Sequence, residues 1–336
     1  MDFSFYDFVL YHRQIKRIAY SLLKNPLVVR NPFYRLAYKA RMKKLMKRYE
    51  EVPFRVMIEN TNFCGANCTF CPHQKMKRPK GVMPFSLSKK ITDECVELGI
   101  DYLTIYGFGE PLLDRHFFER VRYAKRRGIP RVTTNTNAMY LDKRARGLVF
   151  DSGLDEIYIS FDAATEDTYK EIRPGLDFKT VKENILDLCR EKKEKRVNNP
   201  LIILSFVESS KNAHEVKRYL REWKNKVDHI SVSLIHNWTG AVTINNEKVE
   251  GFRDPCRLLW TDMVISWNGD VPLCCNDYEN RIILGNVKKH AIPEIWGNER
   301  LRKIRSWHKN NQFSQIAICK NCLYNYHHKA PWWISQ

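Results

Sequence analysis

Between residue 54 and about residue 235, short apolar and β-branched runs alternate six times with segments of helical periodicity. The apolar runs begin near Phe54, Tyr102, Arg131, Glu156, Leu201 and His229. The helical patterns occupy residues 88–98, 115–127, 142–149, 178–195 and 212–225. This alternation is typical of a parallel sheet covered by helices, because neighbouring parallel strands need a long crossover connection. It therefore predicts an α/β fold with its ligand crevice at the carboxyl ends of the strands.

Three cysteines follow the first apolar run closely. Cys64, Cys68 and Cys71 form a C-x₃-C-x₂-C loop directly after the alternating segment 54–58. A structural zinc site needs four ligands, and His73 is the nearest candidate for the fourth. A four-iron cluster held by three thiolates would instead leave one iron open to a ligand that is not protein. Three unrelated buried thiols are a third interpretation, which the regular spacing disfavours.

This loop resembles the first motif of the radical S-adenosylmethionine (SAM) superfamily, C-x₃-C-x-aromatic-C. Cys64, Cys68, Phe70 and Cys71 occupy the matching positions. The resemblance implies a partial (β/α)₆ barrel in which the three cysteines bind a 4Fe–4S cluster. It further implies that the open iron chelates SAM, with Phe70 beside the cofactor.

A second motif stands at the end of the next predicted strand, in the segment Gly107-Phe-Gly-Glu-Pro111. It resembles the Gly-Gly-Glu-Pro turn of the same superfamily, with Gly109, Glu110 and Pro111 matching and Phe108 replacing the first glycine. A Gly-Glu-Pro turn alone is a common connector. In this position, the resemblance implies that the turn meets the amino group of SAM.

Two later strand ends and one helix end complete the predicted cofactor site. By resemblance, Asn135 and Ser160 contact the ribose or methionine part of SAM. Arg173 is implied to pair with the SAM carboxylate, which suits the forked guanidinium. The alternative for Arg173 is a helix C-terminal charge that complements the helix dipole before Pro174-Gly175.

A second set of cysteines lies in the C-terminal region. Cys256, twelve residues, Gly269, four residues and Cys274 resemble the C-x₉₋₁₅-G-x₄-C signature of SPASM and twitch extensions, and Cys319 and Cys322 complete four ligands. The full SPASM form has three more cysteines, which this sequence lacks. The resemblance therefore implies one auxiliary 4Fe–4S cluster with no open iron. Four thiolates also suit zinc, and the sequence does not distinguish the two.

These features predict four segments: a basic helical N-terminal arm over 1–50, a radical SAM partial barrel over 51–236, a linker over 237–255, and a small α+β iron–sulfur module over 256–336. In that module we expect a hairpin over 263–273 with a type I′ turn at Asn268-Gly269, followed by a helix over 292–309. The arm has twelve Lys or Arg against three Asp or Glu, within a chain of net charge +19. Its interpretations are a packed flank of the barrel, an anionic membrane contact, and a contact with an acidic partner or nucleic acid.

Taken together, the resemblances imply an enzyme that cleaves SAM to a 5′-deoxyadenosyl radical and takes hydrogen from its substrate. The auxiliary spacing resembles the 2-deoxy-scyllo-inosamine dehydrogenase type. It therefore predicts the two-electron oxidation of a polyol or sugar-type alcohol, with the auxiliary cluster accepting the second electron. Such a reaction needs a base for the hydroxyl proton, for which His236, Asp254 and Asp277 are candidates near the predicted mouth.

Two other functions remain open. One is a SPASM maturase that modifies a ribosomally made peptide or protein; the other is a basic iron–sulfur protein that binds nucleic acid without catalysis. The second is disfavoured because no aromatic and basic stacking face is evident. The expected partners are a small-molecule or peptide substrate and an electron donor such as flavodoxin or ferredoxin, with no specific nucleic acid. Because neither a membrane span nor a signal peptide is apparent, we expect a cytoplasmic protein, peripheral to the membrane if the arm binds lipid.

Overall fold

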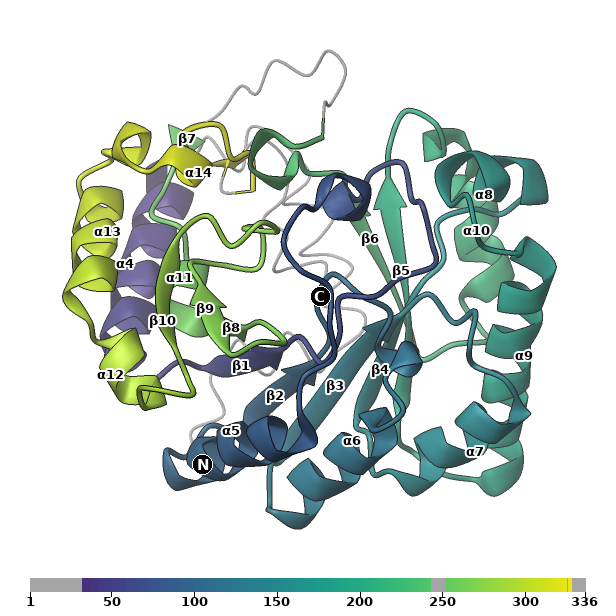
Figure 1. Cartoon of the computed structure of the whole chain (residues 1–336). Helices are drawn as coiled ribbons and strands as arrows, with labels where there is room; N and C mark the ends of the chain where they lie inside the picture. Colours follow the sequence, from purple (N-terminus) through teal and green to yellow (C-terminus); the bar gives the residue numbers. More distant parts are fainter. Residues whose placement is uncertain (1–31, 243–251, 325, 328–336) are drawn as a thin grey trace.

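The computed structural model describes residues 32–242, 252–324 and 326–327 (Figure 1). Its centre is a seven-stranded sheet with the order β6-β5-β4-β3-β2-β1-β8, in which every neighbouring pair is parallel. The strands are β1 Arg55–Ile58, β2 Tyr102–Ile105, β3 Arg131–Thr136, β4 Glu156–Ser160, β5 Leu201–Glu208, β6 His229–Leu234 and β8 Asp262–Ile265. The first six begin at or within one residue of the predicted positions, so the predicted α/β fold is confirmed.

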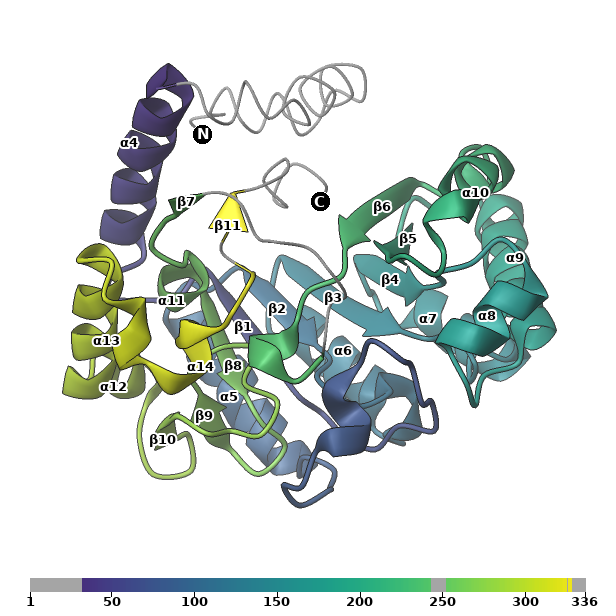
Figure 2. The same ribbon diagram turned by 90° about the horizontal axis from the view of Figure 1, so that it is seen from above.

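Six helices lie on the outer side of this curved sheet (Figures 1 and 2). They are α5 Phe85–Glu97, α6 Phe117–Arg126, α7 Lys143–Asp151, α8 Glu166–Ile172, α9 Phe178–Lys195 and α10 Val216–Trp223. Asp142 and Asp177 cap α7 and α9 by accepting a hydrogen bond from the backbone N–H three residues later. Only α8 was not predicted, because seven residues are too few to establish a helical period.

Apolar residues of the strands and helices form one continuous core. Every residue of β2 is buried, and in the neighbouring helices Ile91, Val121 and Ile185 are completely buried. Parallel strands covered by helices carry unbroken apolar runs, which explains why the sequence pattern locates them well.

The C-terminal cysteine-rich region joins the same sheet through β8. This strand pairs with β1 in parallel, from Arg55 opposite Asp262 to Ile58 opposite Ile265. The predicted hairpin is therefore wrong in its pairing: β9 (Asp270–Pro272) pairs instead with β10 (Ile283–Asn286) in antiparallel fashion. The turn forms one residue earlier than predicted: Gly269 N–H donates to Ser266 O at 2.8 Å, so its central residues are Trp267 and Asn268. It is not type I′, because neither central residue has a positive φ; Gly269, the last residue of the turn, has a φ of 92°.

The rest of this region is made of short elements. They are β7 Phe252–Arg253, α11 Leu258–Thr261, α12 Ile292–Trp296, α13 Glu299–Lys309, α14 Ala317–Lys320 and β11 Tyr326–His327. The single helix predicted over 292–309 is wrong: it is divided at Gly297, and Asn298 caps α13 through Leu301 N–H. The boundaries of the four predicted segments stay predictions. The strand β8 lies in the segment predicted as a separate iron–sulfur module but belongs to the barrel sheet.

Residues 32–48 of the basic arm form the helix α4 (Pro32–Arg48). It packs against α11 and buries Tyr38 and Met42. Directly after it, Tyr49 O accepts a hydrogen bond of 3.0 Å from Trp296 Nε1. The predictions for residues 1–31, including membrane contact, lie outside the described residues. Among the helices described, none is both long and apolar enough to cross a membrane.

Candidate functional site

The loop with Cys64, Cys68 and Cys71 leaves the carboxyl end of β1 and is fastened to the segment that follows α8. Asn67 N–H donates to Pro174 O at 2.7 Å, and Thr69 N–H donates to Ile172 O at 2.9 Å. Burial raises the pKa of all three thiols, that of Cys64 to about 11 and that of Cys71 to about 12. Their conversion to thiolates therefore requires a compensating positive charge, which a bound metal would supply.

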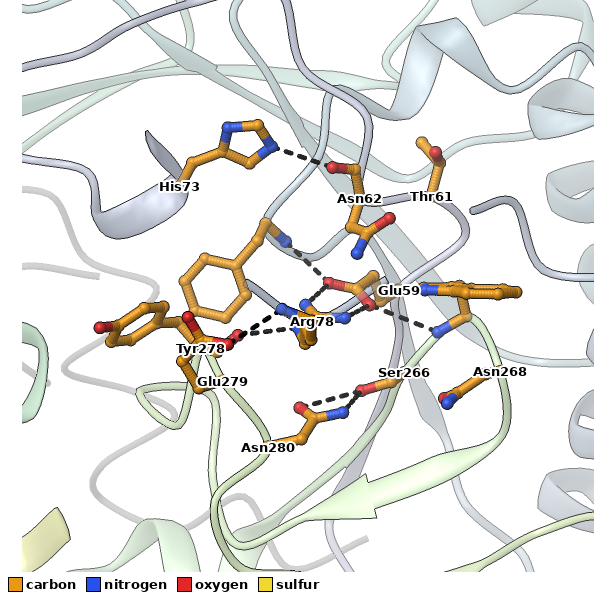
Figure 3. Close-up of polar contacts among 12 residues, drawn as sticks. Glu59, Thr61, Asn62, His73, Arg78, Ser266, Asn268, Tyr278, Glu279 and Asn280 are labelled. Carbon is orange, nitrogen blue, oxygen red and sulfur yellow. Dashed lines mark hydrogen bonds and ion pairs between the residues drawn. The ribbon is translucent and has the colours of Figure 1, made fainter. Parts of the chain in front are cut away.

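His73 does not complete this cysteine set. Its Nε2 lies 2.9 Å from Asn62 O, and its Nδ1 lies 3.5 Å from Gln74 Nε2 (Figure 3). Both ring nitrogens are thus engaged by neighbouring residues of the same loop. The structure gives no support to a zinc site that uses His73.

The Gly107–Pro111 turn lies directly against the cysteine loop. A Cβ atom on Gly109 would stand 2.3 Å from Thr61 O and 2.8 Å from Phe63 O, so only glycine permits this approach of two backbones. Glu110 N–H donates to Phe63 O at 2.8 Å. The turn therefore fixes the start of the cysteine loop.

The Glu110 side chain is buried and joins the ends of two strands. Its carboxylate accepts hydrogen bonds from Thr136 Oγ1 (2.6 Å), Asn137 N (2.8 Å) and Leu112 N (3.2 Å). Burial raises its pKa, whereas these hydrogen bonds act in the opposite direction. Neighbouring groups of the chain thus already donate hydrogen bonds to this carboxylate. The predicted contact of the turn with SAM stays a prediction.

Arg173 ends α8 and points inward. Its Nε and Nη2 bind Oδ2 of the buried Asp162, and its Nη1 lies 3.4 Å from Cys68 Sγ. The ring of Phe70 lies 5.3 Å from the guanidinium carbon. In this structure the fork is directed at Asp162, and Arg173 is buried rather than an exposed helix-end charge. Its contact with the SAM carboxylate stays a prediction.

Asn135 and Ser160 lie at the carboxyl ends of β3 and β4, and both are partly exposed. Ser160 stands opposite Ser205 of β5. The cysteine loop and the Gly107–Pro111 turn follow β1 and β2 at the same edge. The structure thus places these predicted SAM contacts at the carboxyl ends of neighbouring strands.

Figure 3 shows a polar network that the sequence analysis missed. Glu59 is buried directly after β1, and its carboxylate accepts hydrogen bonds from both Nη atoms of Arg78, at 2.5 and 2.8 Å. The backbone N–H groups of Phe108 and Trp267 lie 3.3 Å from the same carboxylate. One buried acid thus connects the cysteine loop, the Gly107–Pro111 turn and the C-terminal region.

The far side of Arg78 extends the network to the segment after Cys274. Its Nε donates to Tyr278 O at 2.7 Å, and its backbone N–H donates to the Glu279 carboxylate at 3.1 Å. Phe108, the residue that departs from the expected motif, contacts the rings of Trp238 and Tyr278 at 5.4 and 6.2 Å between centroids. No sequence signal indicates these contacts, because the partners are up to 208 residues apart.

The C-terminal cysteines are brought together. Cys256, Cys274, Cys319 and Cys322 line one cavity, although they are spread over 67 residues of sequence. Burial raises the pKa of each thiol, and the neighbouring Arg253 partly opposes this at Cys319 and Cys322. Among the described residues, no three His, Cys, Asp or Glu side chains converge on a point suited to a single metal ion.

Two basic side chains border the same cavity, and the sequence analysis named neither. Arg253 donates through Nη2 to Cys319 O, and its guanidinium lies over the Phe313 ring. His308, which is 1% exposed, accepts a hydrogen bond at Nδ1 from Cys256 N–H at 3.2 Å. Burial lowers the pKa of His308 to about 3, so its ring is neutral at physiological pH.

The three candidate bases have different surroundings. The His236 ring follows β6 and lies 4.1 Å from the Trp238 ring, whose Nε1 donates to Phe70 O at 2.8 Å. Burial lowers the pKa of His236 to about 4. The buried Asp277 caps a turn by accepting from Arg281 N and Ile282 N, each at 2.9 Å. Asp254 is buried next to β7. Trp238 thus connects His236 to the first cysteine loop.

Two protein families match the chain. Residues 58–220 match the radical SAM superfamily, and residues 256–323 match SPASM, an iron–sulfur cluster-binding domain. The first range contains the Cys64–Cys71 loop, and the second contains Cys256, Cys274, Cys319 and Cys322.

Among known proteins, GTP 3′,8-cyclase of Limosilactobacillus fermentum is 31% identical over 220 residues, which cover 55% of this chain and 61% of that protein. The chain spans less than two thirds of the length of the first curated relatives that it matches. A crystal structure of BtrN in complex with AdoMet and 2-DOIA has a TM-score of 0.55 at 17% identity, covering 81% of this chain and 93% of BtrN. The crystal structure of Streptococcus suis SuiB bound to precursor peptide SuiA has a TM-score of 0.64 at 17% identity, and the match covers 88% of this chain and 77% of SuiB. At such identities the likeness shows the fold alone.

Proposed function

Because the chain is a radical SAM protein with a SPASM-type cluster-binding domain, we propose that it cleaves SAM and oxidises a polyol or sugar-type alcohol by two electrons. The observation that carries this proposal is the cavity lined by Cys256, Cys274, Cys319 and Cys322. A site with four protein thiolates has no open iron, so its use is electron transfer rather than SAM binding.

The residues present fit the groups that these domains bind. Cys64, Cys68 and Cys71 would hold a 4Fe–4S cluster and leave one iron for SAM, and the four C-terminal thiols would hold the auxiliary 4Fe–4S cluster. When bound, the two clusters supply the electron that cleaves SAM to the 5′-deoxyadenosyl radical and accept the electron that leaves the substrate. Soft thiolate ligands suit iron–sulfur clusters.

The chain's own residues position the cofactor and exclude water. In our proposal Phe70, Gly109, Glu110 and Pro111 form one wall of the SAM site. Three further residues complete the SAM site: Asn135 and Ser160 at the ends of β3 and β4, and Arg173 at the end of α8. The close approach of Gly109 to Thr61 leaves no space for solvent between the turn and the cysteine loop.

The oxidation balances with one base. Bound SAM would supply the radical chemistry that removes the hydrogen atom from the hydroxyl-bearing carbon. His236 then takes the hydroxyl proton, and the remaining electron leaves the substrate, which becomes a ketone. His236 is the candidate base because its ring lies beside Trp238, which donates a hydrogen bond to Phe70 O in the first cysteine loop.

The test is the iron and sulfide content of anaerobically prepared Cys64→Ala/Cys68→Ala/Cys71→Ala protein. About four irons should remain, whereas the matched variant with Cys256, Cys274, Cys319 and Cys322 changed to Ala should keep only the first cluster. SAM cleavage by the intact protein is the activity control, and polyols are then screened for ketone formation. Zinc or no metal in the triple variant would contradict the proposal, because the second electron would have no acceptor.

A second candidate is the modification of a ribosomally made peptide. Its support is the fold likeness to SuiB, whose structure holds a precursor peptide, and the basic residues of the N-terminal arm, which suit an acidic leader. Deuterium transfer to 5′-deoxyadenosine distinguishes the candidates. Label from a peptide Cα or side chain supports maturation, and label from a carbinol carbon supports alcohol oxidation.

A further inference from the structure

The imidazole of His308 presents an unused hydrogen-bond donor beside the C-terminal cysteines. Its Nδ1 accepts the Cys256 N–H at 3.2 Å. In a neutral imidazole one nitrogen accepts and the other carries the hydrogen, so the hydrogen resides on Nε2. Nε2 is buried and has no hydrogen-bond partner among the described residues.

The described neighbours of His308 offer no acceptor that explains this donor. The Phe313 ring lies 5.0 Å from the imidazole centroid in an edge arrangement, and Arg253 is a cation that cannot accept a hydrogen bond. A buried N–H without a partner is costly, so such groups are rare in native proteins unless a bound species satisfies them. The ring borders the cavity that all four C-terminal thiols line.

We propose that His308 Nε2–H donates a hydrogen bond to a sulfur of the auxiliary cluster, either a sulfide or a cysteine thiolate, and thereby raises the reduction potential of that cluster. This inference rests on the proposed function of the four cysteines. A reduced cluster carries one more negative charge than an oxidised one, so a hydrogen-bond donor stabilises the reduced form. The apolar surroundings strengthen this effect because water does not screen it.

His308 would thus act through the cluster and is a positioning residue rather than a catalytic one. Its consequence for the reaction is direct. A higher potential makes the auxiliary cluster a better acceptor for the electron that leaves the substrate. Arg253, whose charge borders the same cavity, acts in the same direction.

Two substitutions separate the functions of the two ring nitrogens. In His308→Asn, the amide oxygen can still accept the Cys256 N–H, but the side chain is too short to replace Nε2. In His308→Gln, the amide nitrogen reaches the position of Nε2. Both are made in the full-length Cys64→Ala/Cys68→Ala/Cys71→Ala background, so that the auxiliary cluster gives the only iron–sulfur signal.

The measurement is an anaerobic redox titration followed by electron paramagnetic resonance, with iron and sulfide analysis of the same samples. His308→Asn should keep its iron and show at least a tenfold lower ratio of reduced to oxidised cluster at a fixed potential, which equals 59 mV for one electron. His308→Gln should recover part of this loss.

Three outcomes would overturn the inference. An unchanged potential in His308→Asn with full iron content refutes the hydrogen bond and leaves the proposed function intact. Loss of iron from both variants shows that His308 only maintains the structure of the cavity. Absence of iron in the parent background refutes the proposed function and this inference together.

Discussion

Arg173 Nη1 lies 3.4 Å from Cys68 Sγ, so a buried guanidinium directly contacts one member of the first cysteine loop. The other two nitrogens of the fork bind Asp162, whose second oxygen accepts Val207 N–H at 2.6 Å. The end of β4 thus holds the guanidinium in place through a rigid acid. A positive charge fixed in this way favours the thiolate form of Cys68.

Replacement of Arg173 by Lys should therefore impair the site although it conserves the charge. A single ammonium cannot reach Asp162 and Cys68 at the same time with the geometry of the fork. We expect SAM cleavage to fall by about 10–100-fold, the range for groups that orient metal ligands. The measurement is 5′-deoxyadenosine formation at saturating SAM, together with iron content.

Arg190→Lys on α9 is the matched control, because Arg190 is an exposed residue in a surface ion pair with Asp187. It should leave SAM cleavage unchanged. Equal activity of Arg173→Lys and the control would refute the importance of the fork.

Gly109 should not tolerate a methyl group. Its added Cβ would meet backbone oxygens of Thr61 and Phe63, which cannot rotate away as a side chain could. We expect Gly109→Ala to lower the free energy of unfolding by about 1–3 kcal/mol, as overpacking does, and to reduce iron retention at the first cysteine loop. Urea denaturation and iron analysis measure the two effects.

Gly147 in α7 supplies the opposite case. In the part of the chain that the structure describes, no atom lies within 4 Å of a Cβ built there, and the residue is inside a helix. Gly147→Ala should raise the free energy of unfolding by about 0.5–1 kcal/mol. A similar change in the free energy of unfolding for both variants would show that the added methyl group acts in the same way at both sites. It would contradict crowding at Gly109 as the reason for its effect.

The Glu59–Arg78 pair should be a large stabilising contact. Arg78→Met leaves the Glu59 carboxylate buried without its cation, a change that costs about 3–5 kcal/mol in other buried pairs. Glu59→Gln should cost less, since the amide remains neutral and can keep part of the hydrogen bonding. The free energies of unfolding of both variants test this order.

Lys170→Met provides the surface comparison. Lys170 is 61% exposed and pairs with Glu166 at 2.6 Å. Exposed pairs contribute about 0–1 kcal/mol, so this variant should be close to the wild type. A cost for Arg78→Met as small as that for Lys170→Met would contradict the structural role of the network.

The strands of the barrel were predictable because their apolar runs are continuous, as in β2. The pairing of β8 was not, because Asp262 lies opposite Arg55, 207 residues away, and no local pattern reveals such a partner. The helix α8 was missed because its seven residues make fewer than two helical turns, too few to show a helical period. The break between α12 and α13 at Gly297 shows that an apolar period can continue through two helices.

The site divides in the same way. The resemblance to the SPASM signature grouped Cys256, Cys274, Cys319 and Cys322, and the structure places all four around one cavity. Arg78 and His308 gave no signal, because each acts on a distant residue and belongs to no motif. His308 meets Cys256 across 52 residues through a single backbone hydrogen bond. Residues that position others therefore require a structure to be found.

His236 should leave a mark on the pH dependence of stability. Burial lowers its pKa to about 4 in the folded chain, whereas an unfolded histidine titrates near 6.5. Between these values the unfolded state binds more protons, so the free energy of unfolding falls as the pH decreases from about 6.5 to about 4. His236→Gln, which does not titrate, should lack this part of the loss. Denaturation of both proteins at pH 5.0 and pH 7.5 tests this: parallel changes in the two proteins would show that His236 has an ordinary pKa and would contradict its burial as the cause of the loss.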